Sequence, residues 1–220
     1  MRDKVEAFNL VAASYDDWYN HPQGSQVFDA ERKAVHHMIP ATGLGLEIGA
    51  GTGIFAESLT SDERTVICLD PSTEMIGKAR SRGLPCILGY GDLLPIRVDT
   101  LDFSYMVTVL EFITEPEKVF KEIRETAKDN AVLSVLFINS DSSWGELYRE
   151  IGSKGDPVFR HAKIYTLEEA YRLLNAAGYR VTSVLGTLNS DPMSQMVDEA
   201  LVEPGPRSGV LIIHAIGNSN

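Results

Sequence analysis

A glycine-rich segment beside one carboxylate has the residue types best suited to binding a ligand. Residues 46–53 read Leu-Glu-Ile-Gly-Ala-Gly-Thr-Gly, an apolar run with one acidic residue and three glycines at alternate positions. Such a run is typical of a buried parallel strand that turns sharply into a helix. Glycines let the backbone take conformations that a Cβ would forbid, and they let a ligand approach main-chain N–H groups at the helix start. We therefore predict a ligand-binding turn here.

The spacing of the glycines separates this turn from the common dinucleotide-binding turn. The dinucleotide pattern is G-x-G-x-x-G, whose third glycine lets the helix pack closely on the strand. This chain has G-x-G-x-G, and Ile54 stands where that third glycine would fall. With its preceding acidic residue, the segment resembles the first motif of class I S-adenosylmethionine-dependent methyltransferases. The resemblance implies S-adenosyl-L-methionine as the cofactor, bound by Glu47, Gly49, Ala50, Gly51 and Gly53.

A second acidic residue ends the next predicted strand. Residues 66–70 read Val-Ile-Cys-Leu-Asp, and a carboxylate at this strand end is able to accept hydrogen bonds from both ribose hydroxyls of a nucleoside. Asp70 is also explained as the cap of the following helix, and dehydrogenases place an acidic residue here too. Within the resemblance, Asp70 and Pro71 bind the cofactor, and Met75 packs against the adenine or in the core.

The segment after the third predicted strand (residues 85–90) extends the resemblance. Residues 91–95 read Gly-Asp-Leu-Leu-Pro. They are similar to the G-D-x-x-x-L-P-F segment of the ubiquinone/menaquinone-biosynthesis type (methyltransferase type 11), although fewer residues precede the proline here. The resemblance implies that the Asp92 side chain and the Leu93 N–H contact the adenine edge, with Gly91 beside them. A turn-forming aspartate explains Asp92 equally well.

The fourth predicted strand (residues 101–107) leads into a segment that resembles the family's region beneath the transferable methyl group. Val107, at the strand end, is expected to contact the cofactor. Glu111 stands where the family often has a histidine or another polar residue, so the chain departs from the pattern there. A carboxylate at this place would act as a general base or orient the substrate. It is also explained as a surface residue that opens the next helix.

Two further segments are expected to shape the pocket. Residues 8–18 resemble the family's entry F-x-x-x-A-x-x-Y-D-x-W, in which the tyrosine lies over the methionine end of the cofactor. Tyr15 is therefore predicted to bind the cofactor and is, with Glu111, a candidate catalytic residue, whereas core packing better explains Trp18. Residues 139–165, with aromatic residues at helical spacing, either cover the site as a substrate lid or pack against the sheet edge.

The remaining elements complete an α/β pattern. Thr114 and Thr166 each begin a T-x-x-E capping box, which predicts a helix start at both places. Apolar runs predict further strands over residues 130–138, 179–186 and 210–216. The resemblance implies a Rossmann-like three-layer sandwich with helices on both faces of a seven-stranded, mostly parallel sheet. Its strand order would be 3-2-1-4-5-7-6, with strand 7 antiparallel.

This fold predicts a single methyltransferase domain over residues 1–220. A helical cap would span residues 1–40, the cofactor-binding core 44–138, the lid 139–165 and the C-terminal part of the sheet 166–220. The length of 220 residues and a hydrophobic content of 44% agree with one full core.

Charge and cysteine content narrow the class of protein. A net charge of −11 gives no basic surface for nucleic acid, and it disfavours an anionic membrane as the main partner. Cys68 and Cys86 fall in predicted strands without metal-type spacing, so we expect reduced core cysteines and no metal site. The chain start lacks the apolar core of a signal peptide, and no apolar run is long enough to span a bilayer. A cytoplasmic protein is predicted.

Together these patterns predict an S-adenosylmethionine-dependent methyltransferase that acts on a small-molecule acceptor by in-line displacement. Positioning of the acceptor supplies much of such catalysis, so no obligatory catalytic dyad is expected. Two alternatives stay open: a nicotinamide-dependent Rossmann oxidoreductase, and a protein that binds S-adenosylmethionine without catalysis. The sequence leaves the identity of the acceptor and the oligomeric state undetermined.

Overall fold

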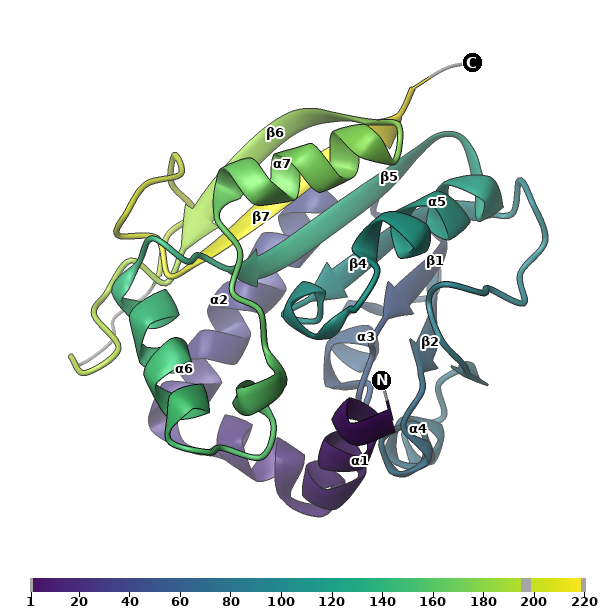
Figure 1. Cartoon of the computed structure of the whole chain (residues 1–220). Helices are drawn as coiled ribbons and strands as arrows, with labels where there is room; N and C mark the ends of the chain where they lie inside the picture. The colour runs from purple at the N-terminus through teal and green to yellow at the C-terminus, as the bar shows by residue number, and fades with distance from the viewer. Residues whose placement is uncertain (1, 195–198, 219–220) are drawn as a thin grey trace.

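Seven strands lie side by side in the order β3-β2-β1-β4-β5-β7-β6 in the computed structural model, which describes residues 2–194 and 199–218 (Figure 1). Strands β1 to β5 pair in parallel, and β7 runs antiparallel to both β5 and β6. The predicted order and the antiparallel seventh strand are confirmed. The strands are β1 Gly43–Ile48, β2 Arg64–Asp70, β3 Cys86–Leu88, β4 Leu101–Val107, β5 Ala127–Ile138, β6 Tyr179–Thr187 and β7 Val210–Gly217.

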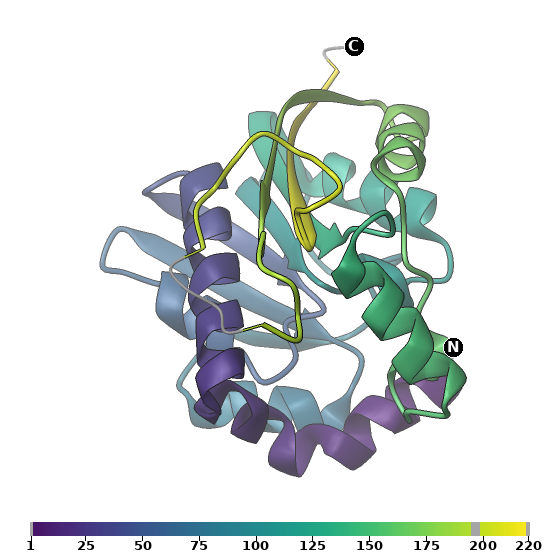
Figure 2. The same cartoon turned by 90° about the vertical axis from the view of Figure 1, so that its left-hand side faces the viewer.

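Helices cover both faces of the sheet, as Figure 2 shows from the side. Helices α2, α3 and α4 pack on one face, and α5 and α7 pack on the other. The α-helices are α1 Arg2–Val11, α2 Pro22–Met38, α3 Ile54–Leu59, α4 Thr73–Ser81, α5 Pro116–Thr126, α6 Ser143–Ser153 and α7 Leu167–Ala176. The 3-10 helices are η1 Ala12–Asn20, η2 Leu110–Phe112 and η3 Phe159–His161. Within the described residues, no helix has the length and apolar character needed to cross a membrane.

The central strands read as nearly continuous apolar runs because helices bury both of their faces. Successive side chains of a strand point to opposite faces. Thus Phe103 and Tyr105 of β4 pack with α2 and α3, whereas Val135 and Phe137 of β5 pack with α5 and α7. All four side chains are fully buried. This double burial holds the strand ends, and the loops that follow them, in fixed positions.

The two predicted capping boxes have different outcomes. Thr166 accepts the N–H of Glu169, whose side chain accepts the Thr166 N–H, so this box is confirmed. The box predicted at Thr114 is wrong. Helix α5 begins one residue later than that prediction requires, with Glu115 at the N-cap and no side-chain cap bond. Pro116 fixes the first helical position, since its ring presets φ and it has no N–H to be capped.

The carboxyl ends of the parallel strands meet at one edge of the sheet, as they must when strands run in the same direction. The segment from α1 to η1 crosses beyond this edge beside α4, and α6 lies beyond the end of β5 (Figure 1). The loop over residues 188–208 also reaches this region, although its residues 195–198 lie outside the described part. Loops and helices from distant parts of the sequence therefore surround this edge.

Candidate functional site

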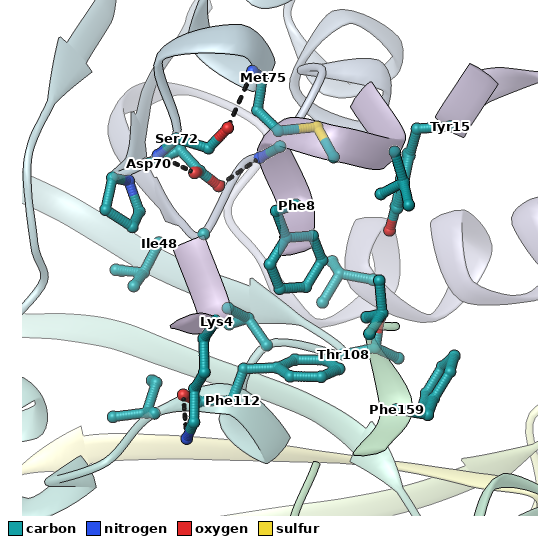
Figure 3. A pocket seen from close by; sticks show the side chains of 18 of the residues that line it. Lys4, Phe8, Tyr15, Ile48, Asp70, Ser72, Met75, Thr108, Phe112 and Phe159 are labelled. Carbon is teal, nitrogen blue, oxygen red and sulfur yellow. Dashed lines mark hydrogen bonds between the residues drawn. The ribbon is translucent and has the colours of Figure 1, made fainter. Parts of the chain in front are cut away.

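A cavity of about 520 Å³ lies at the carboxyl edge of the sheet. Its walls come from α1 and η1, from the loops after β1, β2, β3 and β4, and from α2, α6 and η3. In the view of Figure 3, Asp70, Ser72 and Met75 lie at one end, and Phe112 and Phe159 lie toward the other, with Phe8 between them. The cavity thus has a polar end with backbone donors and an aromatic end.

The carboxylate of Asp70 is fixed by two backbone N–H groups. The Gly51 N–H donates to Oδ2 at 2.9 Å, and the Ser72 N–H donates to Oδ1 at 2.8 Å. Burial raises the pKa of this carboxyl group, and the bonds from Ser72 and Gly51 lower it in part. Since each carboxylate oxygen has more than one acceptor site, both remain able to accept ligand hydroxyl groups. The strand end, the glycine turn and the start of α4 are linked through this one side chain.

Gly51 has open space where its Cβ would be, which leaves room for a bound cofactor.

 A Cβ built on Gly51 has the Met75 Sδ as its nearest neighbour, at 3.9 Å, and both residues line the cavity. The backbone φ of Gly51 is +56°, a conformation that L side chains rarely adopt. A side chain here would be strained and would enter the cavity. Gly49, with φ of +67°, is constrained differently, because its Cβ would meet the Val109 Cγ2 at 2.1 Å.

Most of the residues predicted from the cofactor motifs line this cavity. They are Tyr15, Gly49, Gly51, Asp70, Pro71, Met75, Gly91, Asp92 and Val107. Burial raises the pKa of Tyr15 to about 12, so its phenol is neutral at physiological pH. Trp18, which we expected in the core, also lines the cavity and is 40% exposed. That expectation is wrong because η1 crosses the open edge of the sheet and does not pack within a layer.

Four residues of the predicted cofactor set do not line the cavity. The Glu47 carboxylate is buried behind the glycine turn, where its Oε2 accepts the Tyr105 hydroxyl at 3.0 Å. The Ala50 N–H donates to the Leu69 carbonyl at 3.0 Å and so joins the turn to β2. Gly53 is the N-cap of α3, and a Cβ there would meet Leu84 at 2.7 Å, which indicates close packing. Leu93 is 78% exposed.

Glu111, the other catalytic candidate, is fully buried and does not line the cavity either. Its Oε1 accepts the N–H of Ile138 at 2.6 Å, and its Oε2 has no partner among the described residues. Burial raises its pKa to about 7, which the backbone bond from Ile138 lowers in part. In this structure Glu111 therefore joins η2 to the end of β5. The surface position that we gave as its alternative is wrong.

The N-terminal segment is held over the cavity by polar contacts along its length. Lys4 Nζ donates to the Phe112 carbonyl at 2.9 Å, near the ring of Phe112, which Phe8 contacts edge-on. Further along, Asp16 accepts the Thr52 hydroxyl and pairs with Arg82, in each case at 2.6 Å. Arg82 also pairs with Glu57 and donates to the Thr52 carbonyl. These contacts tie η1 to the glycine turn and to α4.

The aromatic end of the cavity contains residues that the motifs did not identify. Tyr148 of α6 stacks on Phe159 of η3 with ring centroids 4.4 Å apart, so residues 139–165 supply part of the wall. Thr108 has a φ of +47°, which is rare for a β-branched residue and is typical of strained functional sites. Glu31 of α2 lines the cavity and is only 4% exposed. The sequence signal for Glu31 is an acid on an apolar helical stripe, between Val27 and Val35.

Comparisons with known proteins agree with this arrangement. A family model described as "Methyltransferase domain" matches residues 46–135. An uncharacterised protein of Mycobacterium tuberculosis is 32% identical over 199 residues, which are 90% of this chain and 68% of that protein. An uncharacterised protein of Methanocaldococcus jannaschii is 29% identical over 205 residues, which are 93% of this chain and 95% of that protein.

Among solved structures, one similar protein is an S-adenosylmethionine-dependent methyltransferase of Thermotoga maritima, described as a "possible histamine N-methyltransferase". It superposes with a TM-score of 0.87 at 28% identity and covers 97% of this chain and 99% of its own. The similarity includes the cap and the C-terminal strands as well as the central motifs.

Proposed function

The chain belongs to the class I S-adenosylmethionine-dependent methyltransferases and is an enzyme, and from this we propose that it methylates a small-molecule acceptor by in-line displacement. The cavity is the single observation that carries the proposal. Its polar end has the fixed Asp70 carboxylate and the glycine turn, and its aromatic end is enclosed by α2, α6 and η3. A concave cavity of about 520 Å³ suits a small ligand better than a macromolecular surface.

The polar end is proposed to hold the nucleoside of the cofactor. Asp70 would accept the ribose hydroxyls, while Met75 and Asp92 would lie along the base. Gly49 and Gly51 allow the remaining part of the cofactor to approach the main chain, and Tyr15 covers it from η1. When bound, S-adenosylmethionine supplies a methyl group activated on a sulfonium sulfur.

The aromatic end is proposed to hold the acceptor. Val107, the last residue of β4, and Thr108, which follows it, both line the cavity. Phe159, Tyr148 and Phe112 exclude water and hold the apolar part of the acceptor, so that its nucleophilic atom attacks along one line. Positioning of this kind accounts for on the order of 7–11 kcal/mol in favourable intramolecular models.

Calorimetric titration with S-adenosylmethionine and S-adenosylhomocysteine tests the cofactor assignment, with NADH as the control. We expect micromolar binding of the first two ligands and none of NADH. Gly51→Val should abolish binding, because the side chain enters the cavity at a positive φ. Gly77→Val is the matched control, since Gly77 is exposed on α4 and its Cβ would meet nothing within 4 Å.

The titration also distinguishes the two alternatives, an oxidoreductase and a protein that binds S-adenosylmethionine without catalysis. Tight binding of NADH alone would replace the proposal by an oxidoreductase. Binding of S-adenosylmethionine without turnover across a broad acceptor panel would favour a non-catalytic binding protein. The panel should include amines, because the Thermotoga maritima protein is described with an amine acceptor. We further propose a cytoplasmic location, in which the free Cys68 and Cys86 stay reduced.

A further inference from the structure

Glu31 is a buried acidic side chain that faces the cavity without a partner. It is 4% exposed, it lines the cavity, and it forms no hydrogen bond or ion pair with any described residue. Burying a carboxyl group without a hydrogen bond or an opposite charge is unfavourable, so such groups are uncommon in protein interiors. An unpaired buried acid in a cavity is a candidate ligand-binding group.

The titratable groups that interact with Glu31 are tyrosines and one other acid. Tyr15 and Tyr148 interact electrostatically with Glu31 and line the same cavity, as does Tyr19. Glu111 is the charged group that acts on Glu31, and it raises the pKa of Glu31 beyond the effect of burial, to about 8. Burial also raises the pKa of all three tyrosines, so their phenols stay neutral at physiological pH.

We propose that Glu31 binds the amino group of a small arylalkyl or alkyl amine, which is the methyl acceptor of this enzyme. The proposal rests on the proposed function and names its acceptor class. A cation satisfies the unpaired carboxylate, and tyrosine faces attract it through their ring electrons. Neither a neutral alcohol nor an anionic acceptor would provide an opposite charge for this carboxylate.

The proposed transfer balances in charge and atoms. The bound ammonium group gives one proton to Glu31, which leaves a nitrogen lone pair. That lone pair forms the new N–C bond as the S–C bond of the cofactor breaks, with its electron pair going to sulfur. The products are an N-methylammonium ion, a thioether and a protonated Glu31, which is the form that Glu31 has in the free protein. The one proton that the overall reaction yields leaves Glu31 for solvent when the amine binds.

Matched pairs of amines and alcohols test the proposal on the protein saturated with S-adenosylhomocysteine. The pairs are butylamine with 1-butanol, 2-phenylethylamine with 2-phenylethanol, and tryptamine with tryptophol. At least one amine should bind about ten- to hundredfold more tightly than its alcohol, the range for a charged hydrogen bond. Glu31→Gln should remove this preference. Asp29→Asn, an exposed acid on the same helix, should retain it.

Proton release on the unmodified protein gives a second readout. Glu31 is mainly protonated in the free protein at pH 7 and must ionise when the ammonium group binds. Amine affinity should therefore rise by about tenfold per pH unit between pH 6 and 7.5, with nearly one proton released per amine bound. Titrations in phosphate and Tris buffers measure this release. Glu111 titrates in the same range, so Glu111→Gln separates its contribution from that of Glu31.

A failure of the proposed function and a failure of the proposed role of Glu31 give different results. If S-adenosylhomocysteine does not bind, the proposed function fails. If it binds but no amine is preferred over its alcohol, or if Glu31→Gln keeps the preference, only the role of Glu31 fails. A folded Glu31→Gln variant with normal S-adenosylhomocysteine affinity and no amine preference supports the proposal.

Discussion

Three acidic side chains at the carboxyl edge of the sheet, those of Asp70, Glu111 and Glu31, differ in the hydrogen bonds that they accept from the protein. Asp70 accepts two backbone N–H groups and still faces the cavity. Glu111 accepts one backbone N–H and does not line the cavity. Glu31 faces the cavity with no partner among the described residues. Hydrogen bonding to the main chain fixes the first two, whereas ligand binding would satisfy the third.

Asp70→Asn should weaken S-adenosylhomocysteine binding by at least about tenfold. An amide offers one acceptor oxygen, so either the Gly51 or the Ser72 N–H faces an NH₂ group and loses its partner. Calorimetry measures the loss, and Asp102→Asn is the control. Asp102 pairs with Lys128 and accepts the Leu44 N–H at the opposite edge of the sheet. Equal affinity of the Asp70 variant and the unmodified protein would contradict the assignment.

The sequence pointed to Asp70 and Gly51, which line the cavity, because one ends a readable apolar strand and the other closely follows one. It did not identify Glu31, because a single acid on an apolar helical stripe is usually read as a solvated position. Which face of α2 meets the cavity depends on how the helix packs on the sheet. That packing involves contacts distant in sequence, such as the Ser134 hydroxyl donating to the Met38 carbonyl.

At the scale of elements, the two T-x-x-E segments provide a matched pair for helix capping. Thr166→Ala should lower the free energy of unfolding by about 1 kcal/mol, because the capping box of α7 loses its side-chain acceptor. Thr114→Ala should have a much smaller effect, because Thr114 is exposed and caps no helix. Urea denaturation of both variants measures the difference. Equal decreases in the free energy of unfolding of the two variants would mean that the capping box does not stabilise α7.

The N-terminal segment provides a second prediction at this scale. Arg82 joins η1 to α3 and to the glycine turn, so Arg82→Ala should loosen the cover of the cavity. We expect S-adenosylhomocysteine to dissociate about three- to fivefold faster, in the range of one partly exposed ion pair. Hydrogen exchange of residues 2–20 should also accelerate.

Stopped-flow displacement measures the dissociation rate of the Arg82 variant. Arg32→Ala is the control, because Arg32 pairs with Asp29 on the outer surface of α2. An unchanged rate in the Arg82 variant, with normal hydrogen exchange, would mean that the ion pairs do not hold the cover.

Strands were easier to predict than helix starts. Residues 101–107 were predicted as a strand with the bounds that β4 has, because double burial gives a continuous apolar run. By contrast, the start of α5 depends on the backbone at Glu115, whose φ of −128° and ψ of 70° suit no side-chain cap. The T-x-x-E motif does not determine these backbone angles, so it does not locate the start of α5.

At the scale of the whole molecule, the sheet order and the polar end of the cavity could be predicted, but the aromatic end of the cavity could not. The order followed from the resemblance of several motifs in the right succession. The cavity combines side chains from Lys4 to Val210, and most of its aromatic end comes from segments without a family motif. Contacts between such distant segments depend on loop paths that composition and periodicity do not determine.

Buried carboxyl groups also give the whole molecule a predictable response to pH. Burial raises the pKa of Glu31 and Glu47 to about 8 and that of Glu111 to about 7, from 4.5 in the unfolded chain. The folded state therefore binds more protons than the unfolded state between these values. The free energy of unfolding must fall as pH rises in this window, by up to about 1.4 kcal/mol per pH unit for each group.

Urea denaturation between pH 6.5 and 8 tests this response. Most of this window lies above the range in which His214 contributes in the opposite direction, because burial lowers its pKa from 6.5. Glu47→Gln keeps an acceptor for the Tyr105 hydroxyl but removes the titrating group, so its stability should depend less steeply on pH. Glu168→Gln, an exposed acid on α7, should keep the slope of the unmodified protein. A free energy of unfolding that stays constant or rises over this window would contradict the burial of ionisable carboxyl groups on which the site depends.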